Sequence, residues 1–233
     1  MKKIIAVTAA LMMASLSAFA LDITVGARGN FNMGLGTTLE SDNSEYWADK
    51  TSSNIGGGFG VYANFGLLEL GGGSLGVQPE FDMNFNNGMS IDVKSVARYA
   101  LGDKLTFTDS TIDIPVLGTF TYPVMDALSI GGGLGTYISI PFGLDQISKS
   151  GDNEHKYSED FELKAKMNFG LAFDVNGAYK VGPGSIVLDL RYMLDLTSTT
   201  ASSKNKSYGD WGDYNEIITR RLLAIGVGYQ IKF

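Results

Sequence analysis

Hydrophobic and polar residues alternate along most of this chain, in stretches that are separated by polar segments. Near the carboxyl end, for example, Leu223, Ile225 and Val227 alternate with Ala224 and Gly226. Successive side chains of a β-strand point to opposite faces, so a period of two predicts a strand with two unlike faces. We find this pattern in eight stretches, which are residues 22–36, 57–67, 75–86, 111–122, 128–140, 163–176, 186–196 and 222–233.

The connections between these predicted strands alternate between long and short. Residues 37–54, 87–108, 141–162 and 197–215 are long polar segments, predicted as loops, whereas the links near Gly72, Ala127 and Gly182 are short. Within the second loop, residues 93–101 could form a short helix or an extra strand.

Transmembrane β-barrels combine an even number of strands with short turns on one side and long loops on the other. Each apolar stripe also reaches the roughly 9 to 11 residues that a tilted strand needs to cross a bilayer. The pattern therefore predicts an all-β fold, an eight-stranded antiparallel up-and-down transmembrane β-barrel with both chain ends on the short-turn side. Alternation alone also fits a soluble barrel such as a lipocalin, because it does not say which face is wet.

The first twenty residues have the pattern of a secretory signal peptide. Lys2 and Lys3 supply a charged start, residues 4–16 an apolar core, and Ala18 and Ala20 a cleavage site of small residues. We therefore expect cleavage after Ala20 and a single barrel domain over residues 21–233. No later stretch has the roughly 18 uncharged apolar residues of a membrane helix.

The composition excludes several classes of function. The chain has 25 acidic and 18 basic residues, a formal net charge of −7, which argues against a nucleic acid partner. It has no cysteine, so it has neither disulfides nor thiolate metal sites. The glycines at 131–133 and 135 are not followed by a helix pattern, so we assign them to barrel curvature rather than to a phosphate-binding loop. No cofactor is predicted.

The polar faces of the predicted strands carry acids and bases in nearly equal number. An eight-stranded barrel is just wide enough to be filled by its own side chains, and buried charges need partners. We therefore predict a charge network in a filled lumen rather than an open pore. Its members are Arg28, Glu80, Asp82, Asp113, Lys164, Lys166, Asp174, Asp189, Arg191, Asp195 and Arg220, with Asp22 and Lys232 toward the ends. Arg221 falls on the apolar face, and we place it at the outer rim, where a lipid-facing charge costs little.

Two segments resemble a known family. The terminal strand ends on Phe233, and residues 112–117 read Ile-Asp-Ile-Pro-Val-Leu, followed by Tyr122. Both features resemble the small bacterial outer-membrane β-barrels of the OmpX-like, OmpW-like and PorT-like type. The resemblance implies an outer-membrane location with periplasmic chain ends and outer-membrane lipid around the barrel. It also implies that Tyr229, Ile231 and Phe233 form the insertion signal that the barrel-assembly machinery recognises.

Three functions fit this fold. The first is a structural or surface-interaction role, in which acidic loops bind an extracellular ligand through Trp47, Trp211 and Tyr214, because aromatic residues are enriched at binding hot spots. The two tryptophans also fit interfacial anchors. The second is a narrow channel for small hydrophobic molecules, as in OmpW-like barrels. It needs an apolar inward patch, and the inward positions offer only scattered residues such as Leu117, Val187 and Met193.

The third function is a lipid-modifying enzyme, which needs a base within reach of a nucleophile. The only histidine, His155, has Ser148, Ser150 and Ser158 nearby in the sequence. We interpret His155 as a solvated loop residue and expect no enzyme. The acidic run at residues 151–154 lacks the ligand spacing of an EF-hand, so we predict a solvated loop rather than a metal site.

Overall fold

The computed structural model describes residues 22–34, 38–40, 48–93, 103–156, 161–165, 167–197, 199–205 and 211–233. The expected signal peptide lies outside these residues. The described residues contain no helix long and apolar enough to span a bilayer.

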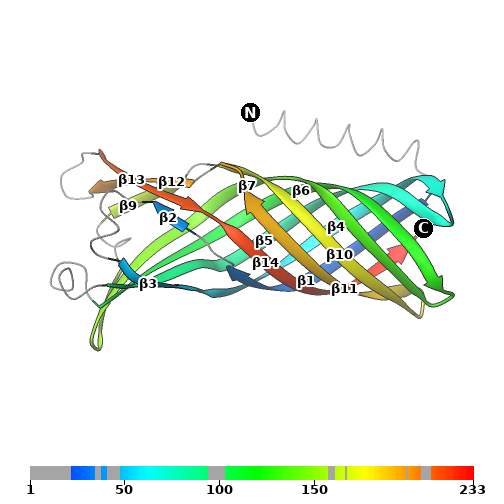
Figure 1. Cartoon of the computed structure of the whole chain (residues 1–233), viewed down its shortest axis with the longest axis horizontal. Helices are drawn as coiled ribbons and strands as arrows, with labels where there is room; N and C mark the ends of the chain where they lie inside the picture. The colour runs from blue at the N-terminus through cyan, green and yellow to red at the C-terminus, as the bar shows by residue number, and fades with distance from the viewer. Residues whose placement is uncertain are drawn as a thin grey trace.

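Eight strands form a closed antiparallel barrel (Figure 1). Each pairs with its neighbour along the chain, and β14 pairs with β1 over Thr24 to Gly34, which closes the cylinder. The predicted fold class is confirmed, and each of the eight predicted strands corresponds to a barrel strand, although the sixth begins later than predicted. The barrel strands are β1 (Asp22–Gly34), β4 (Ile55–Leu70), β5 (Gly73–Val93), β6 (Lys104–Met125), β7 (Leu128–Ser150), β10 (Asn168–Val181), β11 (Gly184–Asp195) and β14 (Arg221–Lys232).

Short turns join the strands at one end of the barrel, which we call the turn end. Gly71, Gly72 and Gly182 in these turns have positive φ angles of 59°, 84° and 62°, which glycine adopts without strain. Asp22 and Phe233 also lie at the turn end, since the Phe233 N–H donates to the Ile23 carbonyl oxygen at 2.8 Å.

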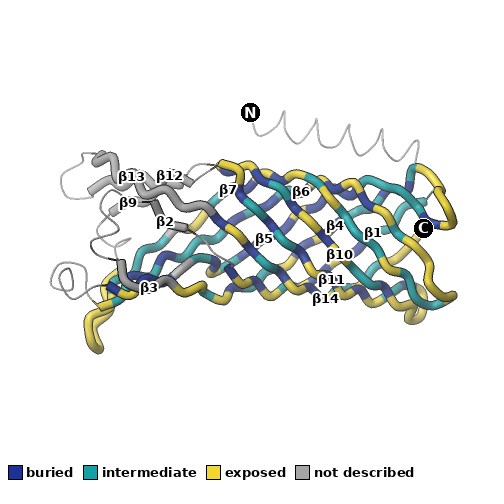
Figure 2. The backbone as a smooth tube through the Cα atoms, viewed as in Figure 1, coloured by how far each residue is buried: buried dark blue, intermediate teal, exposed yellow. Residues whose placement is uncertain are grey.

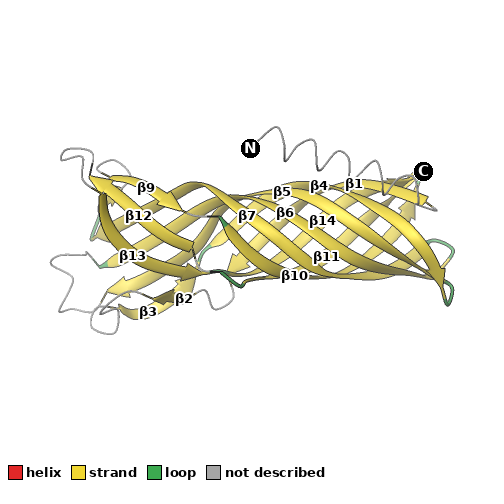
Figure 3. Ribbon diagram, turned by 90° about the horizontal axis from the view of Figure 1, so that it is seen from above, coloured by secondary structure: helices red, strands yellow, loops and turns green. Residues whose placement is uncertain are grey.

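The opposite end carries more strand than the sequence predicts (Figure 3). The four long segments were predicted as loops, and this was wrong for much of their length. β5, β6 and β7 continue far beyond the predicted strands, and six further strands lie in the same region, which we call the extension. They are β2 (Thr38–Glu40), β3 (Ala48–Ser53), β8 (Asn153–Lys156), β9 (Phe161–Ala165), β12 (Thr199–Asn205) and β13 (Trp211–Thr219).

The sixth predicted strand also needs correction. Residues 161–165 form β9, which pairs with β12 in a separate four-stranded sheet, and the barrel strand β10 begins at Asn168. The alternation runs through both segments, so it could not show that they have different partners. In the predicted helix or extra strand at 93–101, Val93 ends β5, and the remaining residues lie outside the described ones.

Exposed and buried residues alternate along the barrel strands (Figure 2), and many of the exposed ones are large hydrophobic residues. Leu190 is 47 % exposed, Val227 56 % and Phe173 43 %, although all three are large hydrophobic residues. An apolar band of this extent around a barrel is the surface that faces lipid. Arg221 is exposed at the first residue of β14, at the extension end of this band, where we expected it.

Candidate functional site

The candidate site is the lumen, because most buried charged residues of the described chain point into it. Two arginines, Arg28 on β1 and Arg191 on β11, meet Glu80 and Asp82 from β5. The Arg28 Nη2 atom lies 2.6 Å from Glu80 Oε2 and 2.8 Å from Asp82 Oδ2. We call these groups, with Asp174 of β10, the Arg28/Arg191 layer.

Arg191 is the centre of this layer. Its Nη1 atom contacts Glu80 Oε2 and lies 3.2 Å from Asp82 Oδ2, and its Nη2 atom lies 2.9 Å from Glu80 Oε1 and 3.1 Å from Asp174 Oδ2. Arg191 is 2 % exposed and Glu80 4 %. The layer therefore ties β1, β5, β10 and β11 together across the lumen.

A second layer lies around Arg220, the residue before β14. Its Nη2 atom lies 3.1 Å from Asp113 Oδ1 and donates to Ser139 Oγ at 3.0 Å, while Nη1 donates to Thr111 Oγ1 at 3.0 Å. Asp195 lies at 3.8 Å from Arg220 Nε and accepts from the Arg220 N–H at 3.1 Å. We call this group the Arg220 layer.

Three asparagines, which were not predicted as site residues, form a hydrogen-bonded group that is joined to the Arg220 layer through Asp113. Asn84 donates to Asp113 Oδ2 at 2.7 Å, and its Oδ1 accepts from Asn32 at 2.7 Å and from Asn30 at 2.9 Å. A signal for them existed. Asn30 and Asn32 continue the polar face that holds Arg28, and Asn84 continues the one that holds Asp82.

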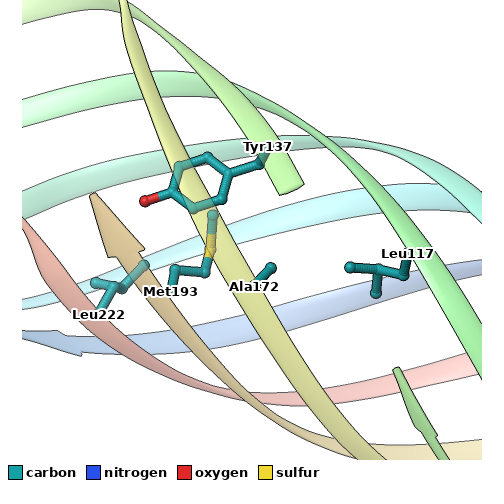
Figure 4. Close-up of a cluster of buried hydrophobic side chains, with 5 residues drawn as sticks. All are labelled: Leu117, Tyr137, Ala172, Met193 and Leu222. Atoms are coloured by element: carbon teal, nitrogen blue, oxygen red, sulfur yellow. The ribbon is translucent and has the colours of Figure 1, made fainter. Parts of the chain in front are cut away.

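An apolar cluster fills one side of the lumen (Figure 4). The prediction that inward apolar residues are scattered was wrong, because the register brings Leu117 and Met193 together with three others. The members are Leu117, Tyr137, Ala172, Met193 and Leu222, each at most 2 % exposed. The Tyr137 hydroxyl donates to Asp195 Oδ1, which joins this cluster to the Arg220 layer. Val187 is not a member.

Inward glycines make room for the charged residues. Gly60 faces Asp82 across the β4–β5 pair, and Gly226 faces Asp189 across the β11–β14 pair. A Cβ atom at either glycine would overlap a carboxylate oxygen of its partner. Inward glycines therefore let a narrow lumen hold large polar side chains.

Between the turn end and the Arg28/Arg191 layer lies a cavity of about 670 Å³. Gly72 and Pro183 line its mouth, and Arg28, Asp174 and Asp189 line its inner part. The side chains of both layers and of the apolar cluster are at most 9 % exposed. They fill the lumen at their level, as expected for a barrel of this width.

Several predicted site residues remain untested. Lys164 lies in β9, but its side chain, like Lys166 and Trp47 as a whole, lies outside the described residues. Trp211 and Tyr214 lie on β13, and their side chains are likewise outside the description. Among the buried residues that are described, six carboxylates face three arginines. The expected balance of charges therefore depends on groups beyond that set.

The residues considered for catalysis lie at an exposed hairpin. Ser148 of β7 pairs with His155 of β8, and Ser150 with Asn153, at the tip formed by residues 151–152. Ser158 lies outside the described residues. The turn-end cavity, at the opposite end of the barrel, is not lined by His155. The described residues also contain no group of three or more His, Cys, Asp or Glu placed to hold a metal.

The terminal strand exposes its apolar face. Tyr229 is 38 % exposed, Ile231 37 % and Phe233 77 %, and the Tyr229 hydroxyl donates to the Val181 carbonyl oxygen at 3.1 Å. These side chains lie at the lipid-facing surface of the turn end. Their role as an insertion signal stays a prediction.

No family model matches the chain, and no curated protein matches its sequence. Solved structures do match. OprG from Pseudomonas aeruginosa superposes with a TM-score of 0.59 at 16 % identity, over 91 % of this chain and 97 % of OprG. The outer membrane protease OmpT from Escherichia coli gives 0.49 at 11 % identity, over 91 % and 95 % of the two chains. A major outer membrane protein from Thermus thermophilus gives 0.49 at 15 % identity, over 90 % and 99 %.

At these identities the likeness to OprG concerns the fold alone. The apolar residues exposed around the barrel are consistent with that fold. The chain is a small eight-stranded β-barrel of the outer-membrane type.

Proposed function

We propose that this barrel is a surface-interaction protein, which holds a platform for an extracellular ligand and neither conducts solutes nor catalyses a reaction. The observation that carries the proposal is the combination of a blocked lumen with a long extension. The Arg28/Arg191 layer blocks the lumen with side chains of at most 9 % exposure. A barrel of this kind acts through what it presents at its ends.

The extension supports the proposal because its outer face suits water rather than lipid. On β5 and β6, Ile91 and Leu105 are buried at 1 % and 2 % exposure. Their neighbours Asp92 and Lys104 pair across the opposite face, together with Lys149 of β7. Charged residues in place of the apolar band indicate that the strands have left the bilayer.

The same asymmetry supports one orientation of the barrel in the membrane. The turn end, with both ends of the barrel sequence, faces the periplasm, and the extension faces outward. Trp47, Trp211 and Tyr214 are the contact candidates in the outer segments, and the excess of acidic residues favours a ligand with basic groups. Phe233 at the turn end is then accessible to the assembly machinery during insertion.

A channel for hydrophobic molecules has less support. It needs apolar side chains along a free passage, whereas the inward apolar cluster is packed at no more than 2 % exposure. We therefore propose no transport role.

Cysteine labelling on intact cells tests the orientation, because the chain has no native cysteine. Asp152→Cys places a thiol on the exposed β7–β8 turn, and Asp126→Cys places a matched thiol on an exposed turn at the other end. A membrane-impermeant maleimide should label residue 152 on intact cells and residue 126 only after lysis. Labelling of residue 126 alone on intact cells would reverse the orientation.

Two further measurements test the function itself. In planar bilayers, the purified barrel should show no stable openings of the size that 16-stranded porins give. Expressing cells should adhere to surfaces coated with a basic protein, and the triple variant Trp47→Ala, Trp211→Ala, Tyr214→Ala should lose adhesion at unchanged surface level. Porin-sized openings, or adhesion that the triple variant leaves intact, would contradict the proposal.

A further inference from the structure

The turn-end cavity contains a carboxylate that the rest of the lumen does not use. Asp189 of β11 is 8 % exposed and lines the cavity. No hydrogen bond or ion pair from the described residues reaches it, and its Oδ1 atom is buried without a partner. Gly226 opposite leaves the space that this oxygen occupies.

The neighbouring arginines are already engaged. Arg28 bonds to Glu80 and Asp82, and Arg191 bonds to the same two acids and to Asp174. Four carboxylates thus face two guanidinium groups, and Asp189 is the one left out. A buried carboxylate without a partner is unfavourable, so this site favours an added positive charge.

The size and lining of the cavity indicate what kind of cation fits. Its volume of about 670 Å³ lies in the range of small-molecule sites, which is roughly 300 to 1,000 Å³. The described residues offer no group of three acids that could chelate a metal ion. Amide and hydroxyl groups line the walls, among them Asn64, Thr119 and Gln230. Such walls suit the polar part of an organic molecule.

We propose that the turn-end cavity binds a small polar molecule through a primary ammonium group, with Asp189 as the charged partner. The ligand enters at the mouth near Gly72 and Pro183, and the Arg28/Arg191 layer prevents it from passing further along the lumen. This site is separate from the outer ligand surface proposed above. Neither proposal depends on the other.

The test uses the full barrel in lipid nanodiscs, with 1,4-diaminobutane as the probe in calorimetric titrations. The neutral analogue 1,4-butanediol is the control ligand, and NaCl and MgCl₂ are separate arms. We expect saturable binding of the diamine and none of the diol. Asp189→Asn keeps the shape and removes the charge, so it should weaken binding about 10-fold or more. Asp126→Asn removes the same charge from an exposed turn outside the cavity and should change nothing.

A second variant keeps the experiment decisive if Asp189→Asn does not fold. Val187 lies on the same inward face two residues before Asp189 and also lines the cavity. Val187→Phe fills space beside the Asp189 carboxylate and leaves the charge of Asp189 in place. It should weaken binding of the diamine. Diamine binding that both variants leave unchanged, equal binding of the diol, or a preference for Na⁺ or Mg²⁺ at Asp189 would each overturn the proposal.

Discussion

Replacing Arg191 with leucine tests the lumen network at its most connected residue. The guanidinium of Arg191 is 2 % exposed and bonds to Glu80, Asp82 and Asp174. Arg191→Leu removes one positive charge and all of these bonds at once. Leucine is apolar and smaller, so it cannot replace any of them.

The expected loss in the free energy of unfolding follows from the partners that each acid keeps in the variant. Glu80 and Asp82 keep Arg28, at 2.6 Å and 2.8 Å. Among the described residues, Asp174 keeps only the Asn176 Nδ2 donor, at 2.7 Å. Removal of one member of a buried ion pair typically costs about 3 to 5 kcal/mol. We expect a loss in this range. The double variant Arg191→Leu, Asp174→Asn should recover part of it, because the unpaired charge is then gone.

The assay is reversible unfolding in urea, with the barrel refolded into lipid vesicles and the folded fraction followed by gel mobility. The neighbouring residue supplies the control. Leu190 points to lipid at 47 % exposure, so Leu190→Val should change the free energy of unfolding by no more than about 0.5 kcal/mol. If Arg191→Leu changed the free energy of unfolding as little as this control, the charge network of the lumen would not stabilise the barrel.

The remaining predictions concern the other surfaces of the barrel. Leu190→Arg places a charge in the apolar band and should lower the free energy of unfolding by about 2 to 4 kcal/mol in the same assay. A barrel that is soluble without detergent would contradict the membrane location. Deletion of Phe233 should lower the amount of barrel in outer-membrane fractions more than it lowers unfolding stability, and unchanged amounts would remove the role proposed for this residue. Gly60→Ala should cost about 1 to 3 kcal/mol, because its Cβ would overlap Asp82, which Arg28 and Arg191 hold in place. Its control is Gly29→Ala, where the nearest atom is 3.9 Å away and no loss is expected.

The barrel strands and their faces were predictable because a strand has only two faces. Residues 188–191 read Leu-Asp-Leu-Arg, and the structure places β11 at Gly184–Asp195 with Leu188 and Leu190 outward and Asp189 and Arg191 inward. Even spacing sorts residues by face without any knowledge of neighbouring strands. The direction in which the buried charges point therefore followed from the sequence.

The partners of those charges could not be predicted, because they depend on the register and on closure of the barrel. Arg191 lies on β11, and two of its acids lie on β5 across the lumen, so no pairing of adjacent strands brings them together. The apolar cluster depends on the register alone: its five members come from five strands, and pairing of adjacent strands places Ala172 opposite Met193 and Met193 opposite Leu222.

The loop prediction for the extension failed for a different reason. Residues 199–205 of β12 are Thr-Thr-Ala-Ser-Ser-Lys-Asn, with no apolar alternation to mark a strand. Their strand character comes from pairing with β9 and β13. Pairing of this kind is a tertiary effect that overrides local preference. Polar composition alone therefore identified these residues wrongly as a loop.

The long sequence separations between partners in the charge network also indicate when the network forms during folding. Arg28 is 52 residues from Glu80, Arg191 is 111 residues from it, and Arg220 is 107 residues from Asp113. Neighbouring strands such as β6 and β7 pair through a short turn and need no closed barrel. Contacts between distant residues form late because loop closure must precede them. The Arg28/Arg191 layer joins β1 to β5, β10 and β11 across the lumen, so it can be complete only in the closed barrel and stabilises that state more than the transition state. We therefore expect the stability lost in Arg191→Leu to appear chiefly as faster unfolding, with the rate of folding nearly unchanged.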